Sequence, residues 1–330
     1  MNPPRSLLLI KPGSMGDVIH ALPVASAIHD AWPETKITWI VDSRWRSLLD
    51  GNPAVHTTRV FPREEFRGFF GAIPGCRWFR RLGELQPDLT VDLQGLLRSG
   101  LMARMAGGRN IVGLGDAREG ARFFYHRLAQ VGCEQHAVDR YLACLPEIGI
   151  EIPKEKQFPV SVGASGPVSA VEGSYIIFHP FARGAGKSLS DEAIREFVRV
   201  FQARSHLKIV IVGTGGIEGH LGEQVVDLTG KTTLRGLAAL MSGARFVVSV
   251  DSGPMHLAAA LKTPLIGIHT WSDPRRVGPY STEAWIWQGG GIRRQSLTSP
   301  PLPEVPFGAE GAAEVAEFVA ARVKELPTAG

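Results

Sequence analysis

The sequence lacks the features that would place the protein in a membrane or send it out of the cell. Its longest apolar runs, such as residues 7–10 and 246–250, are far shorter than the roughly 20 residues that cross a bilayer. The first residues do not show the charged-then-apolar order of a secretory signal. We therefore expect a cytoplasmic protein.

Cysteine is scarce, and the acidic triplet that often holds a divalent cation is missing. The three cysteines, Cys76, Cys133 and Cys144, are odd in number and show no CxxC spacing, which argues against both a disulfide framework and a structural zinc site. No D-x-D triplet occurs in the chain. We therefore expect chemistry that uses neither a metal nor a cofactor.

Two common nucleotide-binding signatures are also missing. The first strand-to-helix turn reads PGSMGD, residues 12–17, and lacks the third glycine of G-x-G-x-x-G. Lys187 and Ser188 lack the first glycine of the P-loop spacing G-x-x-x-x-G-K-[ST]. An NAD-dependent oxidoreductase and a non-catalytic nucleotide-binding module stay as alternatives. Binding of a nicotinamide cofactor would favour the first, and a nucleotide ligand that binds but is never chemically changed would favour the second.

The sequence repeatedly alternates short apolar runs, which predict strands, with segments that predict helices. With 330 residues and 44% hydrophobic content, it should form about two domains. The Pro-, Gly- and Ser-rich residues 151–173 are typical of an interdomain crossing, so we predict α/β domains over 1–160 and 161–330. Short apolar runs predict strands within LLLIK, KITWIV, LTVDLQ, YIIFHP, KIVIVG, RFVVSV and PLIGIH. Helices are predicted after Ser190, around 216–226, 234–241 and 255–261, and over 312–326.

Positive charge is concentrated in one segment. The net charge is only +4, but residues 59–81 hold six arginines against two acidic residues, Glu64 and Glu65. Such a patch suits an anionic partner, which could be a membrane surface, a phosphorylated substrate or a nucleic acid. A solvated surface is the alternative interpretation. Nucleic acid is not expected, because no recognised binding module accompanies the patch.

The sharpest motif is VVSVDSGPMHLAAAL, residues 247–261. A buried strand ends at Asp251, a Ser252-Gly253 turn follows, and Pro254 begins a helix at a position where its missing N–H costs nothing. The free amides of such a helix end form an anion site, and His256 lies one turn into the helix. A plain strand-to-helix connection with a capping serine is the alternative.

Two further loops carry charged side chains after a strand. Residues 179–190 place Arg183 and Lys187 on a glycine-rich loop, where two cations would neutralise a diphosphate. Asp17 follows the glycine-rich turn after the first strand. It is either a helix-capping residue or a general base for an incoming hydroxyl, and spacing alone does not choose between them.

Five blocks of the sequence together resemble a known family. They are KPGSMGDVIHALP, VDLQGLLRSG, DAREGARFFYHR, QHAVDRY and VDSGPMHLAAAL. They are similar to the ADP-heptose:lipopolysaccharide heptosyltransferases of glycosyltransferase family 9, most closely to the heptosyltransferase I type. The resemblance implies a GT-B fold, in which two Rossmann-like parallel-sheet domains face each other across a cleft. Whether the last helix packs back on the N-terminal domain stays open.

The activity implied is an inverting, metal-independent transfer of L-glycero-D-manno-heptose from ADP-heptose to a Kdo residue of the lipopolysaccharide inner core. A heptosyltransferase II, or an enzyme for another sugar or acceptor, is the alternative within the family. The partners implied are ADP-heptose and a Kdo-lipid A acceptor. If the acceptor is a lipid, peripheral contact with the cytoplasmic face of the inner membrane is expected, and it should weaken with salt.

The resemblance also assigns roles to residues. Asp17 matches the catalytic base, and the N-terminal domain is the acceptor-binding one. Donor binding is implied for Arg183, Lys187, Glu218, Asp251, Ser252, Gly253 and His256. For the acidic donor contact, Glu218 is the nearest counterpart and Glu223 a rival. Acceptor binding is implied for Ser14, Gly16, Arg63, Arg67, Gln94 and Arg98.

Overall fold

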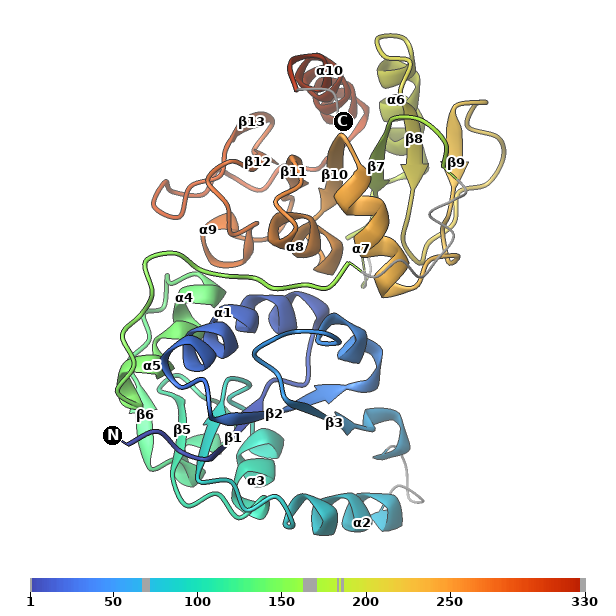
Figure 1. Cartoon of the computed structure of the whole chain (residues 1–330). Helices are drawn as coiled ribbons and strands as arrows, with labels where there is room; N and C mark the ends of the chain where they lie inside the picture. The colour runs from blue at the N-terminus through green and yellow to red at the C-terminus, as the bar shows by residue number, and fades with distance from the viewer. Residues whose placement is uncertain (1, 67–71, 163–170, 183, 185–186, 327–330) are drawn as a thin grey trace. The chain divides into compact units, whose positions relative to one another are not determined.

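The protein forms two compact units, Met1–Ser161 and Val162–Gly330. The computed structural model describes residues 2–66, 72–162, 171–182, 184 and 187–326. The division between the units lies inside the segment 151–173, which the composition marks as the crossing between domains. Each unit is an α/β structure built on its own sheet (Figure 1).

The N-terminal unit holds a six-stranded sheet in the order β3-β2-β1-β4-β5-β6, and every neighbouring pair is parallel. Its strands are β1 (Ser6–Ile10), β2 (Lys36–Asp42), β3 (Thr57–Phe61), β4 (Leu89–Asp92), β5 (Ile111–Leu114) and β6 (Arg127–Ala129). Its helices are α1 (Met15–Ala31), η1 (Ser43–Leu48), η2 (Arg63–Phe66), α2 (Ala72–Leu82), α3 (Leu97–Met105), η4 (Ala121–Phe124), α4 (Ala137–Leu142) and α5 (Cys144–Glu147).

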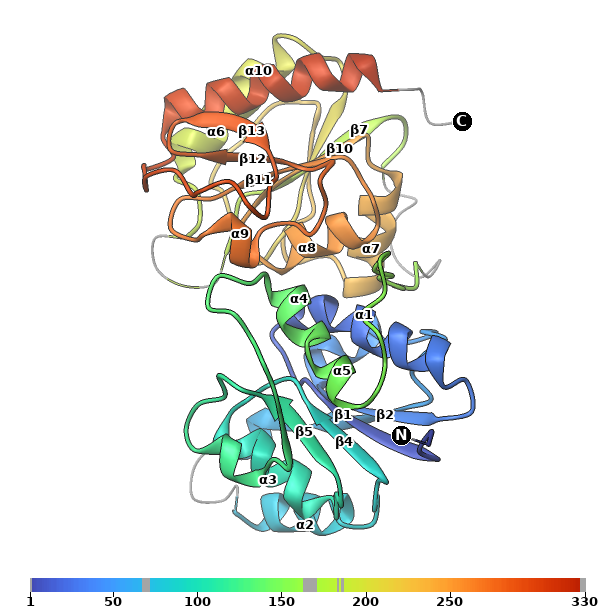
Figure 2. The ribbon, with the colours of Figure 1, turned by 90° about the vertical axis from the view of Figure 1, so that its left-hand side faces the viewer.

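Helices cover both faces of this sheet, as a buried parallel sheet requires. Figures 1 and 2 show α1 and α4 on one face and α2 and α3 on the other. On the second face, Leu8, Ile10 and Ile40 from the strands pack in one buried cluster with Met102 and Ala103 of α3. The strands of this unit that were predicted from LLLIK, KITWIV and LTVDLQ are confirmed as β1, β2 and β4.

The C-terminal unit holds a seven-stranded sheet in the order β13-β12-β11-β10-β7-β8-β9, parallel except for the β12–β13 pair. Its strands are β7 (Tyr175–His179), β8 (Lys208–Ile211), β9 (Val225–Asp227), β10 (Phe246–Val250), β11 (Leu265–Ile268), β12 (Trp285–Gln288) and β13 (Gly291–Arg294). Its helices are α6 (Asp191–Gln202), α7 (Leu234–Gly243), α8 (Gly253–Ala260), α9 (Pro274–Val277) and α10 (Ala309–Glu325).

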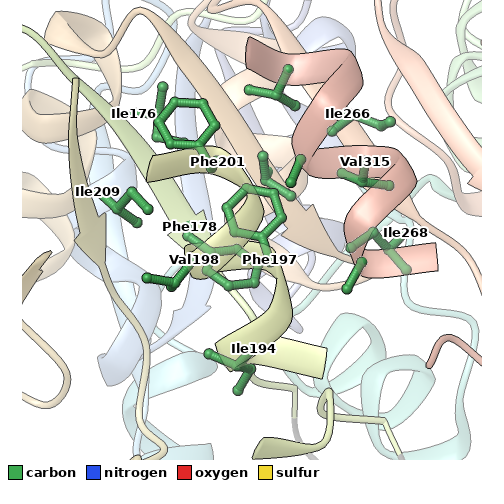
Figure 3. Close-up of a cluster of buried hydrophobic side chains, with 14 of the residues drawn as sticks. Ile176, Phe178, Ile194, Phe197, Val198, Phe201, Ile209, Ile266, Ile268 and Val315 are labelled. Carbon is green, nitrogen blue, oxygen red and sulfur yellow. The ribbon is translucent and has the colours of Figure 1, made fainter. Parts of the chain in front are cut away.

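A large hydrophobic cluster of the C-terminal unit lies between its sheet and two helices, α6 and α10 (Figure 3). Phe178 of β7 stacks on Phe197 of α6 with ring centroids 4.2 Å apart, and Phe197 stacks on Phe201 at 6.0 Å. Val315 brings α10 into the same cluster, so the last helix packs within the C-terminal unit. Truncating a buried ring such as Phe197 to alanine should cost about 3–5 kcal/mol of stability.

One predicted helix is wrong. Residues 216–224 form a loop, and residues 225–226 already belong to β9. The reason is glycine, because Gly219 has φ of 78° and Gly222 has φ of 121°, values that a right-handed helix does not contain. The other predicted helices are confirmed, and Ser190 caps α6 by accepting a hydrogen bond from the Ala193 amide at 3.2 Å.

Counted from the first strand of each unit, the first six strands have the same order in both, 3-2-1-4-5-6, which is the order of dinucleotide-binding folds; the C-terminal sheet adds an antiparallel seventh strand at its edge. The chain leaves the first strand toward one side of the sheet and the fourth strand toward the other. Ligands of such sheets bind in the crevice where the order reverses, outside the carboxyl ends of these two strands. The candidate sites are therefore the loops after β1 and β4 in one unit and after β7 and β10 in the other.

Candidate functional site

In the N-terminal unit, a buried lysine joins the two loops of the switch point. Lys11 directly follows β1, its side chain is 3% exposed, and its ammonium donates to the carbonyl of Leu93, just after β4, at 3.3 Å. The same ammonium lies 3.3 Å from Oδ1 of Asp17 and 4.6 Å from the centre of the Tyr141 ring. A cation without solvent needs such partners, so this contact fixes where Asp17 lies.

Asp17 is held by four hydrogen-bonding or charged groups. Its Oδ1 accepts a hydrogen bond from the Tyr141 hydroxyl at 2.6 Å, in addition to the contact with Lys11. Its Oδ2 accepts from the amide of Ser14 at 2.7 Å and from the Ser14 hydroxyl at 2.9 Å. Ser14 is exposed, whereas Lys11 and Tyr141 are buried. A solvent-borne hydroxyl therefore meets Oδ2, and Oδ1 serves as the anchored side of the carboxylate.

These contacts keep Asp17 ionised. Burial alone would raise the pKa of the carboxyl group, but Lys11, Tyr141 and Ser14 together stabilise the anion and hold its pKa below the usual value. Tyr141 responds in the opposite sense, since burial and the neighbouring Asp17 raise its pKa well above its ordinary value. At neutral pH, Asp17 is thus a carboxylate that can accept a proton. Asp17 also caps α1, so the two interpretations of this residue are compatible.

A second carboxylate at this switch point is fully buried. Asp92 ends β4 with no exposed surface. It accepts hydrogen bonds from the amides of Gln94 and Gly95 and from the Tyr125 hydroxyl at 2.9, 3.3 and 2.7 Å. Burial raises its pKa. Asp92 therefore shapes the loop that carries Gln94, whereas Asp17 is only partly buried.

The acceptor residues predicted in the N-terminal unit fall into two groups. Ser14, Gly16 and Gln94 lie on the loops of the switch point or in the first turn of α1. Arg63 of η2 and Arg98 of α3 form the other group, and each acts electrostatically on the other and on Asp42. Burial and the charge of Arg63 lower the pKa of Arg98. Arg67 lies outside the described residues.

A third arginine, Arg44, pairs with the acid that interacts with Arg63 and Arg98. Arg44 forms a two-pronged pair with Asp42, at 2.8 and 2.7 Å, so the acid at the end of β2 is already neutralised. Arg63 and Arg98 then keep most of their positive potential for a ligand. Two guanidinium groups in this position are suited to carboxylate or phosphate.

In the C-terminal unit, the helix after β10 begins without a side-chain cap. Ser252 is the N-cap residue of α8, yet its hydroxyl donates backward to the carbonyl of Val250 at 3.1 Å and makes no cap hydrogen bond. Pro254 occupies the first turn, as the sequence predicted. The amide end of α8 is thus left to attract an anion through its partial positive charge.

Loops after three neighbouring strands bring charge to the same edge. The ammonium of Lys187, after β7, lies 3.5 Å from the centre of the Trp271 ring, after β11. Lys187 and His256 also lower the pKa of Asp251, after β10, although burial has the larger effect and raises it overall. The predicted residues Lys187, Asp251 and His256 are therefore close enough to interact. Arg183 lies outside the described residues.

A buried histidine supports the turn at Ser252. Nδ1 of His179, the last residue of β7, lies 3.3 Å from the Ser252 hydroxyl and 3.2 Å from that of Ser249. Burial lowers the pKa of His179 to about 4, so the ring is neutral at pH 7. A neutral ring accepts or donates a hydrogen bond without adding charge. It orients the serine and leaves the positive potential to Lys187 and the helix end.

The structure does not join Glu218 to these residues. Glu218 is exposed in the loop between β8 and β9, and its carbonyl accepts a hydrogen bond from Arg195. Within the described part of the chain, no hydrogen bond or ion pair connects its carboxylate with Lys187, Asp251 or His256. Its rival Glu223 is exposed in the same loop. The acidic donor contact therefore stays a prediction.

Neither a metal cluster nor a membrane span emerges from the residues that the structure covers. Among them, no three or more His, Cys, Asp or Glu side chains gather as metal ligands would. None of the helices described has the length and apolarity needed to cross a membrane.

Four residues of the two sites were not singled out from the sequence. Lys11 and Tyr141 hold Asp17, while His179 and Trp271 contact Ser252 and Lys187. Lys11 and Tyr141 did lie within two of the blocks that carry the family resemblance, KPGSMGDVIHALP and QHAVDRY. Asp17 and Tyr141 are 124 residues apart in the chain, so no local sequence pattern indicates their contact.

Two Rossmann-like units in one chain are the architecture of the GT-B fold, and solved heptosyltransferases with this architecture match the chain. A sequence profile described as glycosyltransferase family 9 (heptosyltransferase) matches residues 76–295. The chain therefore belongs to glycosyltransferase family 9 and is an enzyme of that family, which confirms the resemblance and the GT-B fold class.

Individual relatives agree with the family. The chain is 30% identical over 294 residues to lipopolysaccharide heptosyltransferase 1 of Pseudomonas aeruginosa, which covers 83% of this chain and 81% of that protein. It is 29% identical over 297 residues to lipopolysaccharide heptosyltransferase 1 of Escherichia coli K12, covering 85% and 92%. The solved structure of E. coli heptosyltransferase WaaC with ADP-2-deoxy-2-fluoro heptose matches with a TM-score of 0.75 and 25% identity, over 96% of this chain and 99% of that one.

Proposed function

We propose that the protein is an inverting, metal-independent heptosyltransferase of the heptosyltransferase I type. It transfers L-glycero-D-manno-heptose from ADP-heptose to a Kdo residue of the lipopolysaccharide inner core, at the cytoplasmic face of the inner membrane. The proposal assigns the proton transfer to the N-terminal unit and the binding of the ADP group to the C-terminal unit. The observation that carries it is the ionised and anchored Asp17 carboxylate within a family 9 chain.

The donor assignment is supported by the open end of α8 and the cations beside it. A diphosphate gains a hydrogen bond from the Gly253 amide at the start of α8 and Coulombic energy from Lys187, and both strengthen as negative charge develops on the departing ADP. The WaaC structure, which matches this fold, holds an ADP-sugar analogue. The Trp271 ring beside Lys187 restricts where the ammonium can lie, which lowers the entropy lost on binding.

The role of Asp17 follows from its two differently placed oxygens. Oδ1 is fixed by Lys11 and Tyr141, so the carboxylate does not rotate when Oδ2 exchanges Ser14 for an acceptor hydroxyl. The hydroxyl oxygen attacks the anomeric carbon, the bond from that carbon to the phosphate oxygen breaks, and ADP leaves with the electron pair. The acceptor proton passes to Oδ2 as the new bond forms, when the hydroxyl has become strongly acidic.

The heptosyltransferase I assignment rests on the relatives, because four proteins named lipopolysaccharide heptosyltransferase 1 match at 28–30% identity. A relative named lipopolysaccharide heptosyltransferase 3 from E. coli K12 matches at 24%. Arg63 and Arg98 suit an acceptor with carboxylates or phosphates, which Kdo-lipid A supplies.

The test is turnover of ADP-heptose with two acceptors, Kdo₂-lipid A and the same lipid already carrying one heptose. The proposal expects transfer to the first and none to the second, unchanged by a chelator, with the new linkage inverted at the anomeric carbon. Transfer only to the heptosylated lipid would assign a heptosyltransferase II. Loss of activity in chelator, restored by a divalent cation, would remove metal independence.

A further inference from the structure

The N-terminal unit exposes an apolar stripe that its own fold leaves unused. On α3, Leu97, Leu101 and Met105 are 49%, 38% and 41% exposed and recur every four residues, so they lie on one helix face. Phe123 of η4 is 93% exposed. We call these four side chains the α3 surface. Single exposed apolar residues are ordinary, but a row of them with a fully exposed ring is typical of a contact surface.

The two elements of the α3 surface lie against each other. Gly100 on α3 faces the Phe124 ring and the Ala121 carbonyl of η4 so closely that a side chain at position 100 would approach them to 2.7 and 3.3 Å. The Arg118 amide donates to the Gly95 carbonyl at 2.8 Å, and Oε2 of Glu119 accepts from the Leu97 amide at 3.3 Å. The stripe is therefore a structured feature of the fold.

Positive charge surrounds the apolar stripe. Arg104 lies on α3, and Arg118 and Arg122 flank or belong to η4; all three are exposed, and within the described residues none of them forms an ion pair. Figures 1 and 2 show α2 on the same face of the sheet as α3. Helix α2 adds Arg77, Arg80 and Arg81, also exposed. Fewer acids than arginines lie along these elements: Glu84 is exposed, Glu119 accepts a hydrogen bond from the Leu97 amide, and Asp116 pairs with Arg140 at 2.7 Å.

We infer that the α3 surface docks the protein on an anionic lipid bilayer. Apolar side chains that enter the interface, rimmed by arginines that meet lipid phosphates, are what such a surface requires. The stripe begins at Leu97, next to the acceptor candidate Arg98, so docking holds a lipid-borne acceptor beside the N-terminal switch point. This last step rests on the proposed function, whereas bilayer binding does not.

The binding test uses the full chain with vesicles of phosphatidylethanolamine and phosphatidylglycerol, and with vesicles of phosphatidylcholine alone. We expect co-sedimentation with the anionic vesicles, weak binding to the neutral ones, and loss in high salt. The double substitution Leu101→Ser, Phe123→Ser should lower the partition coefficient about tenfold or more. Ile152→Ser removes another apolar side chain, 44% exposed, from the same unit and should leave binding unchanged.

The charges are tested separately. Arg104→Gln with Arg122→Gln should lower binding to the anionic vesicles about tenfold or more, since each arginine near the surface contributes on the order of 1 kcal/mol and 1.4 kcal/mol is a factor of ten. Lys262→Gln with Lys324→Gln removes the same charge from exposed positions of the C-terminal unit and should change binding little. An equal loss of vesicle binding in both double variants would mean that only the net charge matters, and it would overturn the inference.

Two readouts separate this inference from its alternatives. The Leu101, Phe123 variant should keep wild-type turnover on a delipidated, soluble acceptor and lose it on acceptor in vesicles. Loss on both would implicate the catalytic site instead, and wild-type activity on both would overturn the docking role. Thermal unfolding should match the wild type, because the side chains are exposed. If the variant instead converts a dimer to a monomer in light scattering, the α3 surface is an interface between copies of the chain.

Discussion

The two units share a topology, but the helix ends at their switch points differ in charge. In the N-terminal unit, the helix after the first strand begins with Ser14, and its amide end is already neutralised by the carboxylate of Asp17. In the C-terminal unit, the helix after the fourth strand begins with Ser252, which does not cap it. One switch point therefore presents a fixed anion, and the other attracts an anion.

The strand order determines where the site lies in each unit, and a few side chains determine its chemistry. Asp17, at the third helical position, accepts the hydrogen bond of the amide at the start of α1. The buried Lys11 offsets the negative charge of Asp17. At α8 the corresponding position holds Met255, which brings no charge. The same fold thus places a carboxylate at one switch point and an uncapped helix end at the other, and these are the base and the diphosphate site of the proposed function.

The largest effect is expected from Asp17→Asn. It removes the proton acceptor and should lower kcat about 10²- to 10⁴-fold, while the affinity for ADP, measured by calorimetry, stays at the wild-type value. Asp30→Asn, at the exposed far end of the same helix, is the matched control and should keep full turnover. Wild-type kcat in the Asp17 variant would contradict its role as base.

The next largest effect is expected in the C-terminal unit, from Lys187→Met. Loss of a charge-assisted contact to the diphosphate should weaken ADP binding by about 10- to 100-fold, because such contacts contribute on the order of 1.5–3 kcal/mol. Lys262→Met, at the opposite end of α8, should bind ADP normally. If the Lys187 variant binds ADP like the wild type, the C-terminal switch point is not the donor site.

An intermediate effect is expected from Tyr141→Phe, read as a pH profile of kcat. The hydroxyl lowers the pKa of Asp17, so its removal raises that pKa and moves the acidic limb of the profile to higher pH, by about one unit. The stability lost in this variant should be greatest near neutral pH and should vanish as the pH falls through the folded-state pKa of Asp17. An unmoved acidic limb would show that Tyr141 does not act through Asp17.

The smallest effect compares the serines at the N-cap positions of the two helices, Ser14 of α1 and Ser252 of α8. Ser14→Ala removes a hydrogen bond to Asp17 and should lower the free energy of unfolding by about 1 kcal/mol. Ser252→Ala should change it by less than about 0.5 kcal/mol, since this hydroxyl does not cap α8. Equal losses in urea unfolding would mean that the two helix ends are alike.

Much of this organisation could be predicted from local patterns. The apolar runs gave seven strands in the right places, and the proline after Ser252-Gly253 marked the start of α8. The helix predicted at residues 216–226 does not form, because Gly219 and Gly222 adopt positive φ. Short strands such as β6 and β9 have three residues each, too few for a pattern.

The candidate sites were predicted in their local parts only. Asp17 and the 251–256 turn were found because glycine, proline and a charged residue stand together in the sequence. The contacts of Tyr141 with Asp17, and of Trp271 with Lys187, join residues far apart in the chain. They depend on the strand order, which brings distant loops to one edge of a sheet. No local rule contains that order.

The central claim is the division of labour between two alike folds. The most direct test is a crystal structure of this chain with ADP bound. We predict the diphosphate at the amide end of α8, next to Ser252 and Gly253 and within reach of the Lys187 ammonium. A diphosphate on the turn of Gly13 and Gly16, with the end of α8 left to solvent, would contradict it.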